Sequence, residues 1–156
     1  MKARIVVRRE SPEQPEAVRL LTLADEWSAS LYPAESRHGL SLASLIEHEV
    51  RFYLARSDGL ATGCGGYSLL PGRAAEMKRV FGTASARGQG IGRAIVEAAE
   101  AGATAEHVAR IYLETGVKSD EAVRLYRRLG YAECKPFGAY GSDPLSVFMV
   151  KSLSSR

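Results

Sequence analysis

Three alternating glycines in the middle of the chain separate a predicted strand from a predicted helix. Residues 76–82 belong to the strand, the helix covers residues 91–106, and the junction between them contains Arg87-Gly88-Gln89-Gly90-Ile91-Gly92-Arg93. Glycine allows positive φ and lets a ligand approach the backbone closely. The first turn of a helix presents free N–H groups and a partial positive charge, which attract phosphate. The junction therefore predicts a pyrophosphate-binding loop, with further positive charge from the arginine at each end.

Length and composition are those of an ordinary globular protein. The chain has 156 residues, so we expect one domain spanning residues 1–156. Its hydrophobic fraction is 46% and its charged fraction is 25%. No apolar run approaches the roughly 18 residues that a membrane-spanning helix needs, and the charged residues 1–9 are unlike a signal peptide. The net charge of +3 is too small to indicate nucleic-acid binding.

The two cysteines, Cys64 and Cys134, lack the spacing of a metal site. Two reduced thiols are the simpler interpretation, and a disulfide is the alternative. We therefore expect a cytoplasmic protein without a metal ion and without a nucleic-acid or membrane partner.

Periodicity and turn residues predict alternating strands and helices, and hence an α/β fold. Pro33 is expected to stop the first helix, Asp58-Gly59 to form a hairpin turn, and Ser119 to cap the last helix. The predicted strands cover residues 3–8, 51–56, 60–70, 73–82, 110–114, 131–136 and 146–153. The predicted helices run from Pro12 or Pro15 to about residue 31, after Ser41, over residues 91–106, and from Ser119 to Gly130.

Two other phosphate-binding motifs do not fit the glycine loop. A dinucleotide-binding loop requires G-x-G-x-x-G, but the sixth position is Arg93 counted from Gly88 and Ile95 counted from Gly90. The G-x-x-x-x-G-K-[ST] loop of nucleoside triphosphatases is absent from the sequence. A nicotinamide enzyme, a kinase and an ATPase are therefore disfavoured.

Two motifs, in matching order and separation, resemble those of the Gcn5-related N-acetyltransferase (GNAT) superfamily. Residues 87–92 match R/Q-x-x-G-x-G/A, and residues 122–131 resemble A-x-x-L-Y-x-x-x-G-F/Y. The resemblance covers nearly the whole chain. It is closer to a bacterial subgroup labelled indole-3-acetic acid acetyltransferase-like, through the segments PAESRH (33–38), EMKR (76–79), LETG (113–116), PFGAY (136–140) and DPLSVFM (143–149). It implies a mixed central sheet of about six to seven strands with a splayed strand pair, flanked by about four helices.

The resemblance implies acetyl-coenzyme A as the acyl donor. Its pyrophosphate would take backbone N–H groups of residues 88–93, and its pantetheine arm would pair with the backbone of residues 80–82 at an exposed edge of the splayed pair. A backbone N–H there could also stabilise the developing oxyanion. Ser119 stands where many members have a cofactor-contacting asparagine. The implied cofactor-binding residues are Val80, Phe81, Gly82, Arg87, Gly88, Gln89, Gly90, Ile91, Gly92, Arg93 and Ser119.

The resemblance makes Tyr126 the proton donor to the departing thiolate. A core position on the helix stripe is the simpler interpretation of this tyrosine, and the two roles are compatible. Glu76 is the candidate base that removes a proton from the acceptor amine. The alternatives are an ion pair of Glu76 with Lys78 or a solvated edge, and the other candidate bases are Glu35, His38 and Glu114.

Segments 32–38 and 137–140 border the acceptor pocket in the family. The predicted acceptor-binding residues are Tyr32, Glu35, His38, Lys78, Arg79, Phe137 and Tyr140, of which Lys78 or Arg79 could pair with a carboxylate. We expect transfer to a small-molecule amine by direct attack in a ternary complex. A protein N-terminal or lysine acetyltransferase and a coenzyme A-binding protein with little catalysis are the alternatives. A homodimer is compatible with the sequence.

Overall fold

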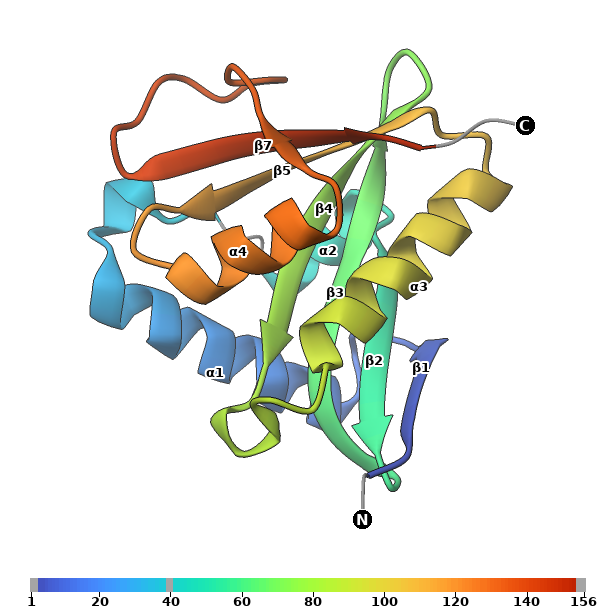
Figure 1. Ribbon diagram of the computed structural model, residues 1–156. Coiled ribbons are helices and arrows are strands. Elements are labelled where there is room, and N and C mark those ends of the chain that lie inside the picture. The colour runs from blue at the N-terminus through green and yellow to red at the C-terminus, as the bar shows by residue number, and fades with distance from the viewer. Residues whose placement is uncertain (1–2, 39–40, 154–156) are drawn as a thin grey trace.

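The computed structural model describes residues 3–38 and 41–153. Within these residues a seven-stranded sheet has the order β1-β2-β3-β4-β5-β7-β6, and β4 and β5 are its parallel pair. Helices α1 and α2 lie on one face of the sheet, and α3 and α4 lie on the other (Figure 1). The strands are β1 (Ile5–Arg9), β2 (Arg51–Ser57), β3 (Leu60–Leu70), β4 (Ala74–Gly82), β5 (Arg110–Gly116), β6 (Ala132–Glu133) and β7 (Ser146–Ser152). The helices are α1 (Pro15–Leu31), α2 (Leu42–Glu47), α3 (Ile91–Ala105) and α4 (Asp120–Arg128), with short 3₁₀ turns η1 (Ala34–Ser36) and η2 (Ala84–Ala86). The predicted mixed α/β architecture is confirmed.

Local sequence signals account for most element boundaries. Tyr32, which precedes Pro33, is extended (φ −131°, ψ 146°), so α1 ends at Leu31 as predicted. The start of α1 is Pro15 and not Pro12. Asp58 and Gly59 have φ of 50° and 87°, the paired positive values that a tight hairpin turn requires.

The strand predicted at residues 131–136 is much shorter than expected. Only Ala132 and Glu133 pair with β7, and Cys134 adds one backbone bond to Phe148 (2.8 Å). Pro136 has no N–H with which to continue the ladder, and the chain turns away into the loop before β7.

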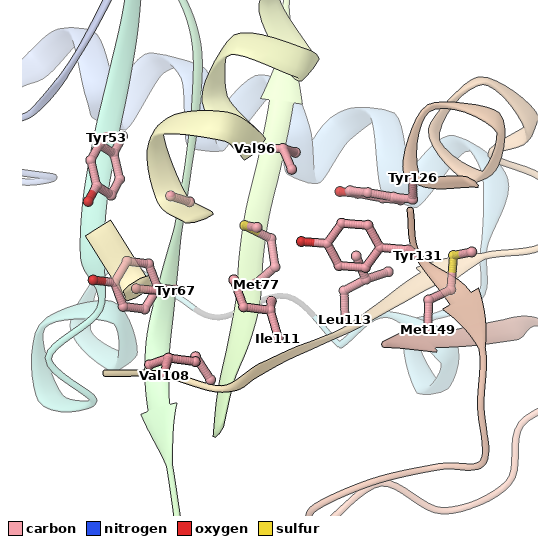
Figure 2. Packing of buried hydrophobic residues seen from close by; sticks show 13 residues of the cluster. Tyr53, Tyr67, Met77, Val96, Val108, Ile111, Leu113, Tyr126, Tyr131 and Met149 are labelled. Atoms are coloured by element: carbon pink, nitrogen blue, oxygen red, sulfur yellow. The ribbon is translucent and has the colours of Figure 1, made fainter. Parts of the chain in front are cut away.

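Small residues in β3 let α3 lie close to the sheet. A Cβ at Gly63 would come within 2.4 Å of Ile91, and one at Gly65 within 2.8 Å of Ile95. Both isoleucines are buried. The larger apolar cluster on this face contains Tyr126 and Tyr131, drawn in Figure 2, whose rings meet edge to face at 5.6 Å.

The parallel pair β4–β5 splays apart. The two strands pair only where Ala74, Ala75 and Glu76 meet Arg110, Ile111 and Tyr112. Beyond this point β4 continues beside β3 to Gly82, whereas β5 continues beside β7 to Gly116, so the strands diverge (Figure 1). The predicted splayed pair is confirmed, and it leaves the backbone of the second half of β4 without a partner on the β5 side.

Candidate active site

A cleft of about 900 Å³ occupies the opening between the diverging strands. It is walled by β4 and β5, by α1 and α4, and by the segment after β4. The structure brings eleven of the predicted site residues to this cleft: His38, Glu76, Lys78, Arg79, Val80, Phe81, Gly82, Arg87, Ser119, Tyr126 and Tyr140. Glu114, the rival base, also lines it.

The glycine loop has the conformation that its sequence predicted. Gly88 and Gly90 have φ of 82° and 80°, in open space, and Gly90 is the N-cap of α3. The first backbone hydrogen bond of α3 joins the Ala94 N–H to the Gly90 carbonyl (3.0 Å). The N–H groups of residues 91–93 come before it and therefore have no acceptor within the helix. The Gln89 N–H donates to the Ala86 carbonyl (3.2 Å), so it is already used inside the loop.

The third glycine has a packing role. A Cβ at Gly92 would come within 2.9 Å of Leu125, so this glycine lets α3 and α4 approach closely. The flanking arginines face different neighbours. The Arg87 guanidinium lies 6.0 Å from the Trp27 ring centroid and 3.6 Å from the Glu121 carboxylate, whereas Arg93 pairs with Glu97 on its own helix.

Strand alternation determines which backbone groups of β4 face the cleft. The Thr83 N–H donates to the Thr62 carbonyl of β3 (2.9 Å), and Phe81 is paired in register with Cys64. Because N–H and C=O directions alternate along a strand, Val80 and Gly82 direct theirs away from β3, toward the side that β5 has left. Phe81 directs its backbone toward β3.

Tyr126 is buried in the wall of the cleft, with 6% of its surface exposed. Figure 2 shows Tyr126 beside Tyr131. The Tyr126 hydroxyl forms no hydrogen bond with any described residue, whereas the Tyr131 hydroxyl donates to Glu100 (2.8 Å). Burial, assisted by the negative charge of Glu114, raises the pKa of Tyr126. The hydroxyl therefore stays protonated at neutral pH and can donate a proton.

Glu76 and Lys78 form the ion pair that was one interpretation of their spacing. The Lys78 Nζ lies 2.8 Å from Glu76 Oε2. The Tyr140 hydroxyl donates to the same oxygen (2.5 Å) and accepts from Lys78 Nζ (2.9 Å). Glu76 is 7% exposed, so this triad compensates a buried charge in the wall of the cleft.

Glu114 faces the cleft from β5 with weaker compensation. Its hydrogen-bond donor is a neutral group, the Ser146 hydroxyl (2.8 Å). Burial raises the pKa of Glu114, although the Ser146 bond and the charges of His38 and Lys78 oppose the rise. A carboxylate with a raised pKa is the better proton acceptor at neutral pH.

His38 and Tyr140 bring two loops to the cleft. His38 Nε2 lies 3.6 Å from Asp143 Oδ2, and its ring meets Tyr140 edge to face. Phe137 does not line the cleft; it packs behind Tyr140, against Tyr112 and Phe148. Glu35 is exposed in η1, away from the cleft.

The prediction that the Ser119 hydroxyl caps α4 is wrong. Ser119 occupies the N-cap position, but its side chain makes no capping bond. Its hydroxyl instead bonds the Tyr32 hydroxyl (3.0 Å), which also accepts from the Lys118 N–H (2.9 Å). Tyr32 thus ties the end of α1 to the turn before α4, and it does not face the cleft.

No site role was predicted from the sequence for Trp27, Ser146 or Asp143. Trp27 lies on the α1 wall of the cleft with 48% of its surface exposed. Ser146 meets Glu114 only because β7 pairs with β5, which no local pattern reveals.

Comparison with known proteins agrees with this geometry. Residues 15–131 match the family model described as acetyltransferase (GNAT) family. An IAA acetyltransferase of Azospirillum brasilense is 43% identical over 150 residues, which cover 96% of this chain and 98% of that protein. A solved structure of an acyl-CoA N-acyltransferase-like protein of Klebsiella pneumoniae is 32% identical, with a TM-score of 0.82 and coverage of 96% and 98%.

A more distant structure shows the same fold. It is the PaiA N-acetyltransferase of Thermoplasma acidophilum in complex with coenzyme A, with 16% identity, a TM-score of 0.73 and coverage of 96% and 99%. Within residues 3–38 and 41–153, no helix combines the length and hydrophobicity needed to cross a membrane. With the splayed strand pair, the glycine loop and the family match in agreement, the chain belongs to the acetyltransferase (GNAT) family and is an N-acetyltransferase.

Proposed function

We propose that this protein transfers an acetyl group from acetyl-coenzyme A to the primary amine of a small molecule, by direct attack in a ternary complex. The observation that carries the proposal is that the unpaired backbone of β4 and the unpartnered hydroxyl of Tyr126 face one cleft. Residues 88–93 do not line this cleft, but its lining reaches Arg87, which directly precedes the glycine loop and the N-terminus of α3. Members of this family use acyl-coenzyme A, and the described residues fit that group.

The N–H groups of residues 91–93 and the backbone of Val80 and Gly82 offer donors suited to a pyrophosphate and to the amides of a pantetheine arm. When bound, acetyl-coenzyme A supplies an activated acetyl thioester. In the proposed reaction the amine nitrogen forms a bond to the acetyl carbon and the carbon–sulfur bond breaks. Tyr126 gives its proton to the thiolate sulfur, which would otherwise leave as an anion.

The proton of the amine needs an acceptor in the cleft. Glu76 was the sequence-based candidate, but its Oε2 is occupied by Lys78 and Tyr140. Glu114 has the raised pKa and the neutral hydrogen-bond donor. We therefore propose Glu114 as the stronger candidate base and assign Glu76 to holding Lys78 and Tyr140 in place.

Lys78 is the proposed partner for an anionic group on the acceptor. Two of its donors are directed to Glu76 and Tyr140, and its side chain is 12% exposed at the cleft. The Arg79 guanidinium is directed at α1 and is not in position for this task.

The test is release of free thiol from acetyl-coenzyme A, with mass-spectrometric detection of the product, across amino acids, polyamines, aminoglycosides and peptides. Indole-3-acetic acid belongs in the panel because the Azospirillum relative carries the name IAA acetyltransferase. Amine-dependent turnover with a small molecule supports the proposal. Turnover only on protein N-termini or lysines, or coenzyme A binding without turnover, would replace it with one of the alternatives.

A further inference from the structure

Strand β4 contains a bulge where it faces the cleft. Lys78 pairs with Gly66 of β3 and Phe81 pairs with Cys64, so Arg79 and Val80 together oppose the single residue Gly65. The extra residue shifts the alternation of the strand by one position. That shift decides that Val80 and Gly82, and not Phe81, direct their backbone groups into the cleft.

Arg79 is an unusual residue for this bulge. Its φ is +60°, in the left-handed region that residues with a side chain rarely adopt. Its side chain is 8% exposed, and Arg79 Nε is buried without a hydrogen-bond partner among the described residues. Backbone strain and an unsatisfied buried donor at one residue persist only where the surroundings impose them, and such residues gather at functional sites.

The rest of the guanidinium ties the bulge to α1. Arg79 Nη1 lies 2.8 Å from Asp25 Oδ1, and Nη2 donates to the Leu21 carbonyl (3.2 Å). On the other side, the buried Cys64 thiol donates to the Arg79 carbonyl (3.5 Å). Leu23, Ala24 and Trp27 of α1 also line the cleft. The contacts of Arg79 therefore connect the α1 wall of the cleft to strand β4.

We propose that Arg79 is a positioning residue: by binding α1 through Asp25 and Leu21, it holds the β4 bulge in the left-handed conformation that aims the backbone of Val80 and Gly82 at the acyl group. The inference rests on the proposed function, in which these backbone groups pair with the pantetheine arm and one of their N–H groups also stabilises the developing oxyanion of the thioester. Arg79 touches neither substrate in this account and acts through the backbone that follows it.

The experiment compares three variants of the full-length, ¹⁵N-labelled protein. Arg79→Gly keeps the left-handed backbone accessible and removes the guanidinium. Asp25→Asn removes the partner charge at a site that is 65% exposed, so the fold is retained even if Arg79→Gly is unstable. Arg51→Gln is the matched control, because Arg51 is bidentate to Glu106 (2.9 and 2.8 Å) and does not line the cleft.

We expect acetyl-coenzyme A to shift the amide resonances of Val80 and Gly82 in the wild-type protein. In Arg79→Gly these two resonances move before any ligand is added, and kcat falls by about 10- to 100-fold while KM for acetyl-coenzyme A changes by less than about 3-fold. Asp25→Asn shifts the two resonances and lowers kcat in the same direction, but by a smaller amount. Arg51→Gln changes neither.

Unchanged Val80 and Gly82 resonances and an unchanged kcat in Arg79→Gly and Asp25→Asn overturn the proposal. So does a loss of activity in Arg79→Gly that matches the loss of folded protein and is equalled by Arg51→Gln. A wild-type protein that transfers no acetyl group refutes the proposed function instead, and the ligand-free resonances of the variants then decide the positioning claim alone.

Discussion

Tyr126 and Tyr131 are neighbours, and we expect loss of the hydroxyl to affect activity at Tyr126 and stability at Tyr131. The rings of Tyr126 and Tyr131 pack edge to face at 5.6 Å in the same apolar cluster, and 6% and 3% of their surfaces are exposed. They differ in their hydroxyls: Tyr131 donates to Glu100 (2.8 Å), whereas Tyr126 has no partner among the described residues. Replacing each with phenylalanine keeps the ring packing and removes only the hydroxyl.

Tyr131→Phe is expected to cost about 1–3 kcal/mol, because Glu100 loses a charge-assisted hydrogen bond and, among the described residues, keeps its contact with Lys151 (2.9 Å). That loss lowers Tm by roughly 3–10 °C for a chain of this size. Its kcat stays within about 2-fold of wild type, because neither Tyr131 nor Glu100 lines the cleft.

Tyr126→Phe is expected to leave the free energy of unfolding unchanged or to raise it by up to ~1 kcal/mol, since no hydrogen bond within the chain is lost. Its kcat falls by about 10²- to 10⁴-fold, the usual contribution of a positioned general acid. The assays are urea unfolding followed by circular dichroism and thiol release at saturating amine. A Tyr126→Phe variant with full kcat, or one destabilised as much as Tyr131→Phe, refutes the reasoning.

Three further changes test other parts of the site. Because burial raises the pKa of Glu114 above its unfolded value, ionisation of this carboxyl costs stability as pH rises through the folded pKa. In urea titrations, the free energy of unfolding of Glu114→Gln should exceed that of wild type by more at pH 8 than at pH 4, and its kcat should fall. An equal stability difference at the two pH values contradicts this prediction. Gly90→Ala and its control Gly59→Ala should each lower the free energy of unfolding by ~1 kcal/mol, because both glycines have a positive φ (80° and 87°) in open space. Only Gly90→Ala should weaken coenzyme A binding in calorimetry, by roughly fivefold if the same ~1 kcal/mol is lost from binding. Tyr140→Phe removes the hydroxyl between Glu76 and Lys78, so it should cost ~1–3 kcal/mol and raise KM for the amine more than KM for acetyl-coenzyme A; equal changes in the two KM values would argue against an acceptor role.

Features that depend on neighbouring residues were predictable from the sequence. The glycine loop, the start of α3, the Asp58-Gly59 hairpin and the end of α1 before Pro33 all follow from φ preferences within a few residues. The splayed strand pair was foreseen through the family resemblance, because no local pattern distinguishes a splayed strand from a paired one.

Features that depend on distant contacts were not predictable. The Ser119 hydroxyl has a free helix end beside it, yet it bonds Tyr32, 87 positions away. Ser146 reaches Glu114 through the β5–β7 pairing, and Tyr140 reaches Glu76 through a loop whose course only the fold defines. The Glu76–Lys78 pair lay between these cases, since strand alternation put both side chains on one face but could not exclude a solvated edge.

Acetyl transfer is proposed to occur in the opening between β4 and β5. The most direct measurement is a crystal structure with acetyl-coenzyme A. We predict the pyrophosphate at the N–H groups of residues 91–93, the pantetheine amides against the backbone of Val80 and Gly82, and the sulfur within hydrogen-bonding distance of the Tyr126 hydroxyl. A donor bound outside this opening, or a sulfur that the Tyr126 hydroxyl does not reach, would contradict the account.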